Sequence, residues 1–191
     1  MPLIRSICVF CGSGPGTDPR FAESAAELGL AIAQAGIQLV YGGGSGGLMG
    51  IVARAVRDNG GHVIGIIPDF LRSKEMMLEG AREMIVTTNM HERKMLMFDR
   101  ADAFVALPGG IGTLEELVEQ LTWSQLGQHN KPIIIADIGG FWRPLMSLLA
   151  HMRETAFIRD GLEVRYQIAE RTEEILPMLN ETMRRRAAVG R

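Results

Sequence analysis

Residues 37–50 read IQLVYGGGSGGLMG, and this stretch decides the fold class. The run Ile37–Tyr41 is short and apolar, with the β-branched and aromatic residues that are typical of a buried strand. A glycine-rich loop follows at once, and the apolar spacing over Leu48–Asn59 then predicts a helix that Gly60 closes. A strand that passes through glycines directly into a helix is typical of a β-α-β unit.

The same alternation extends along the chain on both sides of this stretch. Similar short runs predict strands at Ser6–Cys11, His62–Ile67, Met84–Thr87, Ala103–Leu107 and Ile133–Ala136. Apolar spacing and N-cap residues, Asp18 and Asn89 among them, predict helices over 19–35, 90–100, 114–126, 141–154 and 172–183. The sequence therefore predicts an α/β fold, a doubly wound and Rossmann-like parallel sheet with helices on both faces.

The size and composition of the chain limit the classes of protein to consider. The 191 residues suffice for one domain with its own core, which we expect over 1–183, followed by a basic, flexible tail at 184–191. With 47% hydrophobic and 22% charged residues, the chain is neither disordered nor a coiled coil. A net charge of −2 argues against nonspecific electrostatic binding to nucleic acid or to a membrane surface.

The sequence contains no strong signal for membrane insertion, secretion or redox chemistry. No apolar run is long enough to cross a bilayer, and the N-terminal MPLIRSICVF lacks the apolar core of a signal peptide, so we expect a cytoplasmic protein. Cys8 and Cys11 form a C-x-x-C pattern, but side chains three residues apart on a strand point to opposite faces. We expect buried thiols and no metal, because no second Cys/His pair is present.

Three glycine loops fall at expected carboxyl ends of strands, over Gly12–Gly16, Gly42–Gly47 and Gly109–Gly112. A ligand of a doubly wound sheet binds beyond these ends. The middle loop fits G-x-G-x-x-G, but a dinucleotide site would need it after the first strand, and no G-K-[ST] follows for a Walker A loop. A tight strand-to-helix turn remains the alternative. Candidate ligand contacts in the first two loops are Ser13, Gly43, Gly44 and Gly47.

The third loop, PGGIGT at 108–113, carries a more specific pattern. Gly112 and Thr113 at a helix start are able to donate N–H and O–H groups to one phosphate, and Glu116 follows one turn later. Thr113-x-x-Glu116 also fits a capping box, in which Glu116 only satisfies a backbone N–H. Spacing alone leaves both interpretations open.

A cationic pair precedes another predicted helix, at Arg93 and Lys94 in the run MHERK over 90–94. The two residues either belong to a solvated first turn or bring positive charge to the edge of a ligand. The chain has no further lysines except Lys74 and Lys131, so few groups are available for Schiff-base chemistry.

Together these motifs resemble the Lonely guy family, cytokinin riboside 5′-monophosphate phosphoribohydrolases that are often labelled lysine decarboxylase-like. The resemblance covers about residues 5–180 and rests on CVFCGS at 8–13, GGGSGGLMG at 42–50, MHERK at 90–94 and PGGIGTLEE at 108–116. It implies hydrolysis of the N-glycosidic bond of adenosine 5′-monophosphates, N6-prenylated or plain, to free base and ribose 5-phosphate. It also implies a homodimer that needs no cofactor and no metal.

The resemblance also implies roles for particular residues. Arg93 and Glu116 correspond to the catalytic pair. The positions that correspond to substrate-binding residues are Glu75, Arg93, Lys94, Gly110, Ile111, Gly112, Thr113, Leu114, Glu115, Glu116 and Thr122.

Two other functions are alternatives, a noncatalytic carrier and a dinucleotide oxidoreductase, and the chain lacks a convincing ribose-binding acid and a second substrate domain for the latter. A noncatalytic nucleotide-binding or carrier protein would keep the glycine loops but would not need Arg93 and Glu116. A pyridoxal phosphate decarboxylase needs an internal lysine, and none of the three lysines is well placed. The apolar helix at 114–126 is either an ordinary core helix or the interface of a homodimer.

Overall fold

The structure is a computed structural model that describes residues 4–72 and 78–189. Its strands are β1 (Ser6–Phe10), β2 (Gln38–Tyr41), β3 (His62–Pro68), β4 (Glu83–Thr87), β5 (Ala103–Ala106), β6 (Ile133–Ala136) and β7 (Gln167–Ala169). Its helices are α1 (Pro19–Gln34), α2 (Gly47–Asp58), α3 (Met90–Arg100), α4 (Ile111–Gln125), α5 (Arg143–Glu154) and α6 (Thr172–Val189), with 3-10 turns at Asp69–Leu71 and Ile138–Gly140.

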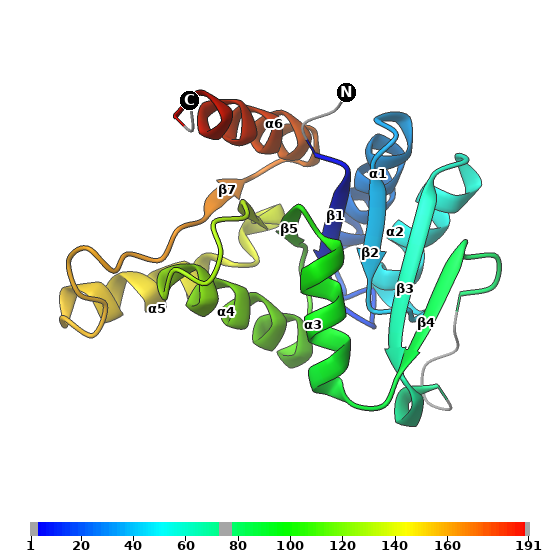
Figure 1. The fold of residues 1–191 in the computed structure, drawn as a ribbon, viewed down its shortest axis with the longest axis horizontal. Coiled ribbons are helices and arrows are strands. Elements are labelled where there is room, and N and C mark those ends of the chain that lie inside the picture. The colour runs from blue at the N-terminus through cyan, green and yellow to red at the C-terminus, as the bar shows by residue number, and fades with distance from the viewer. Residues whose placement is uncertain (1–3, 73–77, 190–191) are drawn as a thin grey trace.

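The strands form one sheet in the order β4-β3-β2-β1-β5-β6-β7, and all neighbouring pairs are parallel (Figure 1). The predicted doubly wound parallel sheet is confirmed. The chain moves outward in one direction from β1 to β4 and in the other from β5 to β7. The order therefore reverses between β1 and β5, and the crevice beyond their carboxyl ends is where such sheets bind ligands.

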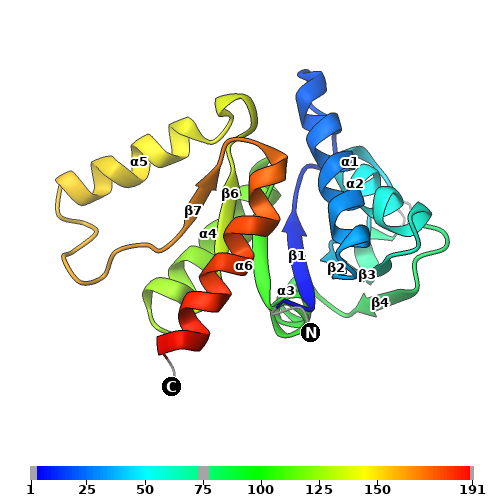
Figure 2. The same ribbon diagram turned by 90° about the horizontal axis from the view of Figure 1, so that it is seen from above.

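Helices cover both faces of the sheet (Figure 2). Each face has its own hydrophobic core. On one face α1, α2 and α6 contribute buried residues such as Leu28, Val52 and Leu179. On the other face α3 and α4 contribute Met97 and Leu117. The strands between them are buried on both sides, as their continuous apolar runs predict.

Local sequence signals account for the helix starts. The Asp18 carboxylate accepts a hydrogen bond from the Arg20 N–H, and Pro19 is the first helical residue of α1. The Asn89 side chain accepts from the Glu92 N–H, and the Glu92 carboxylate in turn accepts from the N–H of Thr88. Both predicted N-caps are confirmed.

Two predictions at the C-terminal end were wrong. The sequence places the last strand at 133–136, but β7 adds a seventh strand beside β6. The helix expected to end at Met183 continues to Val189, so most of the segment predicted as a flexible tail is helical. Arginine and alanine, which fill this stretch, are good helix formers. Among the described residues no helix has both the length and the apolar character needed to cross a membrane.

Candidate active site

The loops that follow β1 and β5 meet at the point where the strand order reverses. The Gly12 N–H donates to the Pro108 carbonyl at 3.1 Å. A cavity of about 310 Å³ lies between these loops, lined by Ser13 on one side and Gly110 on the other, with Phe21 and Phe141 at its edge. The structure thus brings two of the three predicted glycine loops to one hollow.

The middle glycine loop and the start of α2 pack against the loop that follows β1. Gly47 has φ of +53°, and a Cβ there would lie 2.3 Å from the backbone carbon of Ser13. The Met49 N–H donates to the Gly12 carbonyl at 3.2 Å. The backbone of the first loop therefore packs directly against the start of α2 and accepts a hydrogen bond from one of its N–H groups. These contacts explain why the loop needs glycine, and a substrate contact of Gly43, Gly44 or Gly47 stays a prediction.

The start of α4 is open. Gly110 is its N-cap residue and supplies no side-chain cap, and Gly110, Ile111 and Gly112 are exposed. Thr113 is the third helical residue and is buried. The capping-box alternative is therefore wrong, because Thr113 is not the N-cap and Glu116 lies beyond the first turn. The first-turn N–H groups have no partner within the helix and form a site suited to an anion.

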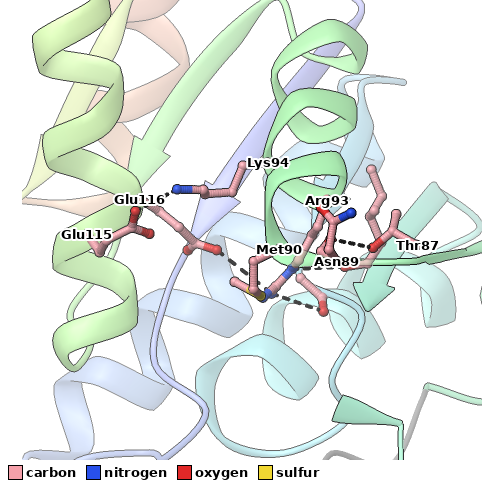
Figure 3. Close-up of polar contacts among 9 residues, drawn as sticks. Thr87, Asn89, Met90, Arg93, Lys94, Glu115 and Glu116 are labelled. Atoms are coloured by element: carbon pink, nitrogen blue, oxygen red, sulfur yellow. Dashed lines mark hydrogen bonds and ion pairs between the residues drawn. The ribbon is translucent and has the colours of Figure 1, made fainter. Parts of the chain in front are cut away.

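Arg93 and Glu116 face each other across the gap between α3 and α4 (Figure 3). Arg93 Nη2 lies 3.8 Å from Glu116 Oε1, and the side chains are 7% and 12% exposed. Arg93 Nε donates to the Ile66 carbonyl at 3.2 Å and Nη2 donates to the Gly42 carbonyl at 3.3 Å. The guanidinium is thus held by the carboxyl ends of β3 and β2, and it presents a positive charge to the carboxylate.

Lys94 does not point to the open start of α4. Its Nζ donates to Glu115 Oε1 at 2.6 Å and to Glu119 Oε1 at 2.9 Å. Burial lowers the pKa of Lys94, but the hydrogen bonds and the charges of the two carboxylates outweigh it and raise that pKa overall. Lys94 therefore ties α3 to α4. Sequence reasoning missed Glu119, although its spacing of four residues from Glu115 places both on one helix face.

The two thiols are buried within electrostatic reach of Glu116. Cys8 and Cys11 are free and buried, and they belong to the cores on opposite faces of the sheet. Burial raises the pKa of both thiols, and the Glu116 carboxylate adds to that shift. The expectation of buried thiols on opposite faces is confirmed. Among the described residues no group of three or more His, Cys, Asp or Glu side chains is arranged to hold a metal ion.

The remaining predicted site residues lie apart from the cavity or are not described. Thr122 is exposed on α4, and its Oγ1 donates to the Val118 carbonyl at 2.7 Å. Ile111 and Leu114 line an apolar hollow against α5, which adjoins the first cavity and shares Gly109, Gly110 and Phe141 with it. Glu75 lies outside the described residues.

Comparison with known proteins finds a matching family and relatives over most of the chain. A family model described as "Possible lysine decarboxylase" matches residues 49–179. A probable cytokinin riboside 5′-monophosphate phosphoribohydrolase of Oryza sativa subsp. japonica is 46% identical over 178 residues, which are 93% of this chain and 77% of the relative. A cytokinin riboside 5′-monophosphate phosphoribohydrolase of Arabidopsis thaliana is 44% identical over 177 residues, 93% of this chain and 82% of the relative.

The chain belongs to the Lonely guy family. The PGGIGTLEE motif by which the sequence resembles this family forms the open start of α4 and carries Glu116. The MHERK motif forms the first turns of α3 and carries Arg93. The two motifs of the Lonely guy family thus meet in one ion pair, although the chain separates them by a strand and a loop.

Solved structures extend the comparison to the fold alone. A molybdenum cofactor carrier protein of Chlamydomonas reinhardtii has a TM-score of 0.69 at 21% identity, covering 94% of this chain and 98% of its own. A molybdenum cofactor binding protein of Rippkaea orientalis has a TM-score of 0.68 at 24% identity, covering 93% and 96%. The chain therefore shares its overall fold with these two proteins.

Proposed function

We propose that this chain hydrolyses the N-glycosidic bond of adenosine 5′-monophosphates, N6-prenylated or plain, and releases free base and ribose 5-phosphate. The names of relatives that match 93% of the chain support this activity. The observation that carries the proposal for this chain is the buried Arg93–Glu116 pair, with its 3.8 Å approach, beside the uncapped start of α4.

The spacing along α4 fits a nucleotide monophosphate. A 5′-phosphate at the N–H groups of Gly112 and Thr113 lies about one turn, roughly 5 Å, from Glu116 along the helix axis. A ribose ring spans about that distance, so C1′ comes near the carboxylate. Cleavage of the glycosidic bond develops positive charge on the sugar, which a carboxylate stabilises. The same carboxylate activates the water that attacks C1′.

Arg93 prepares the carboxylate for this role. A guanidinium near a buried carboxylate favours its charged form and restricts its orientation. Since Arg93 is itself held by two backbone carbonyls, it keeps its place while the substrate enters. No cofactor is part of this mechanism.

The test is product analysis by liquid chromatography with three substrates: AMP, N6-isopentenyl-AMP and adenosine. Wild-type protein releases base from the monophosphates, and Glu116→Gln lowers kcat by about a hundredfold or more, in the range expected for loss of a general base. Adenosine is a poor substrate because it lacks the phosphate anchor. The ratio of the two monophosphates identifies the preferred base.

Two results would contradict the proposal. Equal cleavage of adenosine and AMP would exclude the phosphate anchor at α4. Binding of both monophosphates without release of base would instead favour a noncatalytic carrier.

The surface around α5 supports a homodimer. This amphipathic helix contributes no buried residue and projects from the rest of the molecule (Figures 1 and 2). An apolar hollow of about 380 Å³ lies between α5 and the start of α4, lined by Ile111, Leu114 and Leu148 among others. Ile111 is 82% exposed and Leu148 is 48% exposed. A second copy of the chain would bury this face beside the proposed phosphate site.

A further inference from the structure

A second cavity lies at the opposite end of the sheet from the candidate active site. It has a volume of about 380 Å³ and lies where β6 and β7 begin, between the end of α4 and the last turns of α6. Figure 2 shows these elements gathered on the β7 side of the molecule. The strands are parallel, so their amino ends face away from the glycine loops at their carboxyl ends. We call this hollow the basic cavity.

Four cationic side chains line the basic cavity: Lys131, Arg165, Arg185 and Arg186. Its lining includes no carboxylate among the described residues. Arg185 forms an ion pair with Glu181, one turn back on α6. Within the described part of the chain, Arg165 and Arg186 have no such partner. This concentration of charge is unexpected in a chain whose formal net charge is −2.

Two of these cations, Lys131 and Arg186, are partly buried, whereas Arg165 and Arg185 are exposed at the mouth of the cavity. Burial, followed by the neighbouring positive charge of Arg165, lowers the pKa of Arg186. Burial also lowers the pKa of Lys131, whose Nζ donates to the Phe98 carbonyl at 2.6 Å. Asp99 and Asp102 act on Lys131 from a distance. Glu163 lines an adjoining hollow that Arg165 also lines. Hydrogen bonds from the backbone lower the pKa of Glu163, and the positive charge of Arg165 contributes to that shift. Like charges that share a partly desolvated site are unfavourable unless an anion lies between them.

The other lining groups limit the class of anion. Asn130 and Thr182 add neutral hydrogen-bond donors, while Ile133 and the ring of Tyr166 form an apolar wall. Guanidinium groups match the geometry of phosphate oxygens and bind them through paired hydrogen bonds. A cavity of this size holds a small phosphorylated molecule but not a polymer.

We propose that the basic cavity is a second anion site, which binds the phosphate group of a small phosphorylated molecule independently of the candidate active site. Arg165 and Arg186 hold the phosphate, and Lys131, whose Nζ lies over the Phe98 ring, adds positive charge from the lining. The site joins β7 to the C-terminal part of α6. Binding of the phosphate group therefore stabilises the packing of these two elements.

The experiment must distinguish ligand binding in the basic cavity from ligand binding at the start of α4. Gly110→Asp does so, because a Cβ at Gly110 meets no atom within 4 Å and an N-cap aspartate places a negative charge where a phosphate would lie. In this background, pyrophosphate and ribose 5-phosphate are titrated by calorimetry. Pyrophosphate tests for a compact polyanion, and ribose 5-phosphate tests for a phosphate ester.

The expected result is one binding event per chain, which Arg165→Gln/Arg186→Gln weakens by tenfold or more. Arg82→Gln/Arg100→Gln is the matched control, since it removes the same charge from exposed residues beside β4, and it leaves the affinity within about twofold. Thermal unfolding of each variant confirms that it is folded. Absence of binding by both ligands in Gly110→Asp, or equal affinity after Arg165→Gln/Arg186→Gln, would overturn the proposal.

Discussion

At the scale of single residues, the glycines of the third loop have different functions despite standing side by side. A Cβ at Gly109 would lie 2.2 Å from Thr113 Oγ1 and 2.8 Å from the Gly12 nitrogen. A Cβ at Gly110 or Gly112 would meet no atom within 4 Å. Gly109 is therefore required by packing, whereas Gly110 and Gly112 leave space that a ligand is able to use.

This difference predicts that alanine at Gly109 lowers stability, whereas alanine at Gly110 or Gly112 weakens substrate binding. Gly109→Ala lowers the free energy of unfolding by about 1–3 kcal/mol, the usual cost of overpacking, as measured by denaturant titration. Gly112→Ala keeps or slightly raises stability, because alanine favours the helix, but raises the KM for AMP about tenfold. Gly110→Ala serves as a second variant of the latter kind. A stable Gly109→Ala, or an unchanged KM in both other variants, would contradict this assignment.

The thiols provide a second prediction at this scale. Since burial and the Glu116 charge raise the pKa of Cys8 and Cys11, the thiolate fraction stays very small at pH 8. A disulfide-exchange reagent should therefore label neither cysteine in the folded protein at that pH, and both in denaturant. Rapid labelling of the folded chain would show that the strand opens or that a thiol is activated.

At the scale of elements, the distance between α3 and α4 determines the geometry of the site. Arg93 and Glu116 come from different helices, and Lys94 bridges the same helices through Glu115 and Glu119. Glu119 is 19% exposed and its Oε2 has no hydrogen-bond partner within the described residues. The Lys94 contact therefore compensates a largely buried charge and holds the distance between the two helices.

Lys94→Met is expected to lower the free energy of unfolding by about 2 kcal/mol, because it leaves Glu119 without its charged donor. It also lowers kcat, since the Arg93–Glu116 distance is no longer restrained. Glu115→Gln is the control, because Glu115 is 51% exposed and its pair with Lys94 contributes little. Denaturant titration and AMP hydrolysis measure the two effects, and equal losses in both variants would contradict the argument.

The pH dependence of this contact has a definite sign. The pKa of Lys94 is raised in the folded protein, so its contribution is complete below the ordinary lysine pKa near 10.5 and is lost as pH rises through the folded value. Wild-type protein and Lys94→Met should therefore converge in stability only in strongly alkaline solution.

At the scale of the whole molecule, α5 carries the exposed apolar face that the proposed homodimer would bury. Leu145 and Leu149 pack against the core on one face of the sheet, but no residue of α5 is fully buried and Leu148 is 48% exposed. We expect sedimentation to show a dimer for the wild type and a monomer for Leu148→Glu. Leu30→Glu on α1, where the leucine is 38% exposed, should remain dimeric. A monomeric wild type, or dimers in both variants, would exclude this interface.

Much of the fold is readable from the sequence because its signals are local. The caps at Asp18 and Asn89 depend on neighbours within a few residues, and the buried strands are continuous apolar runs. By contrast, β7 is a short edge strand whose Gln167 and Ile168 are exposed, so its pattern lacks the contrast that predicts a strand. Its pairing with β6 is a contact that only the tertiary structure forms.

The sequence by itself determined the fold class, the family and the presence of Arg93 and Glu116, since motifs and periodicity are properties of the chain. The tertiary structure excluded the capping-box interpretation at α4, because the position of a helix start depends on packing against the neighbouring loop. It also decided that Lys94 binds carboxylates and that Arg165 and Arg186 share one cavity. Such partners are distant along the chain, and electrostatic and packing energies depend on distance in space.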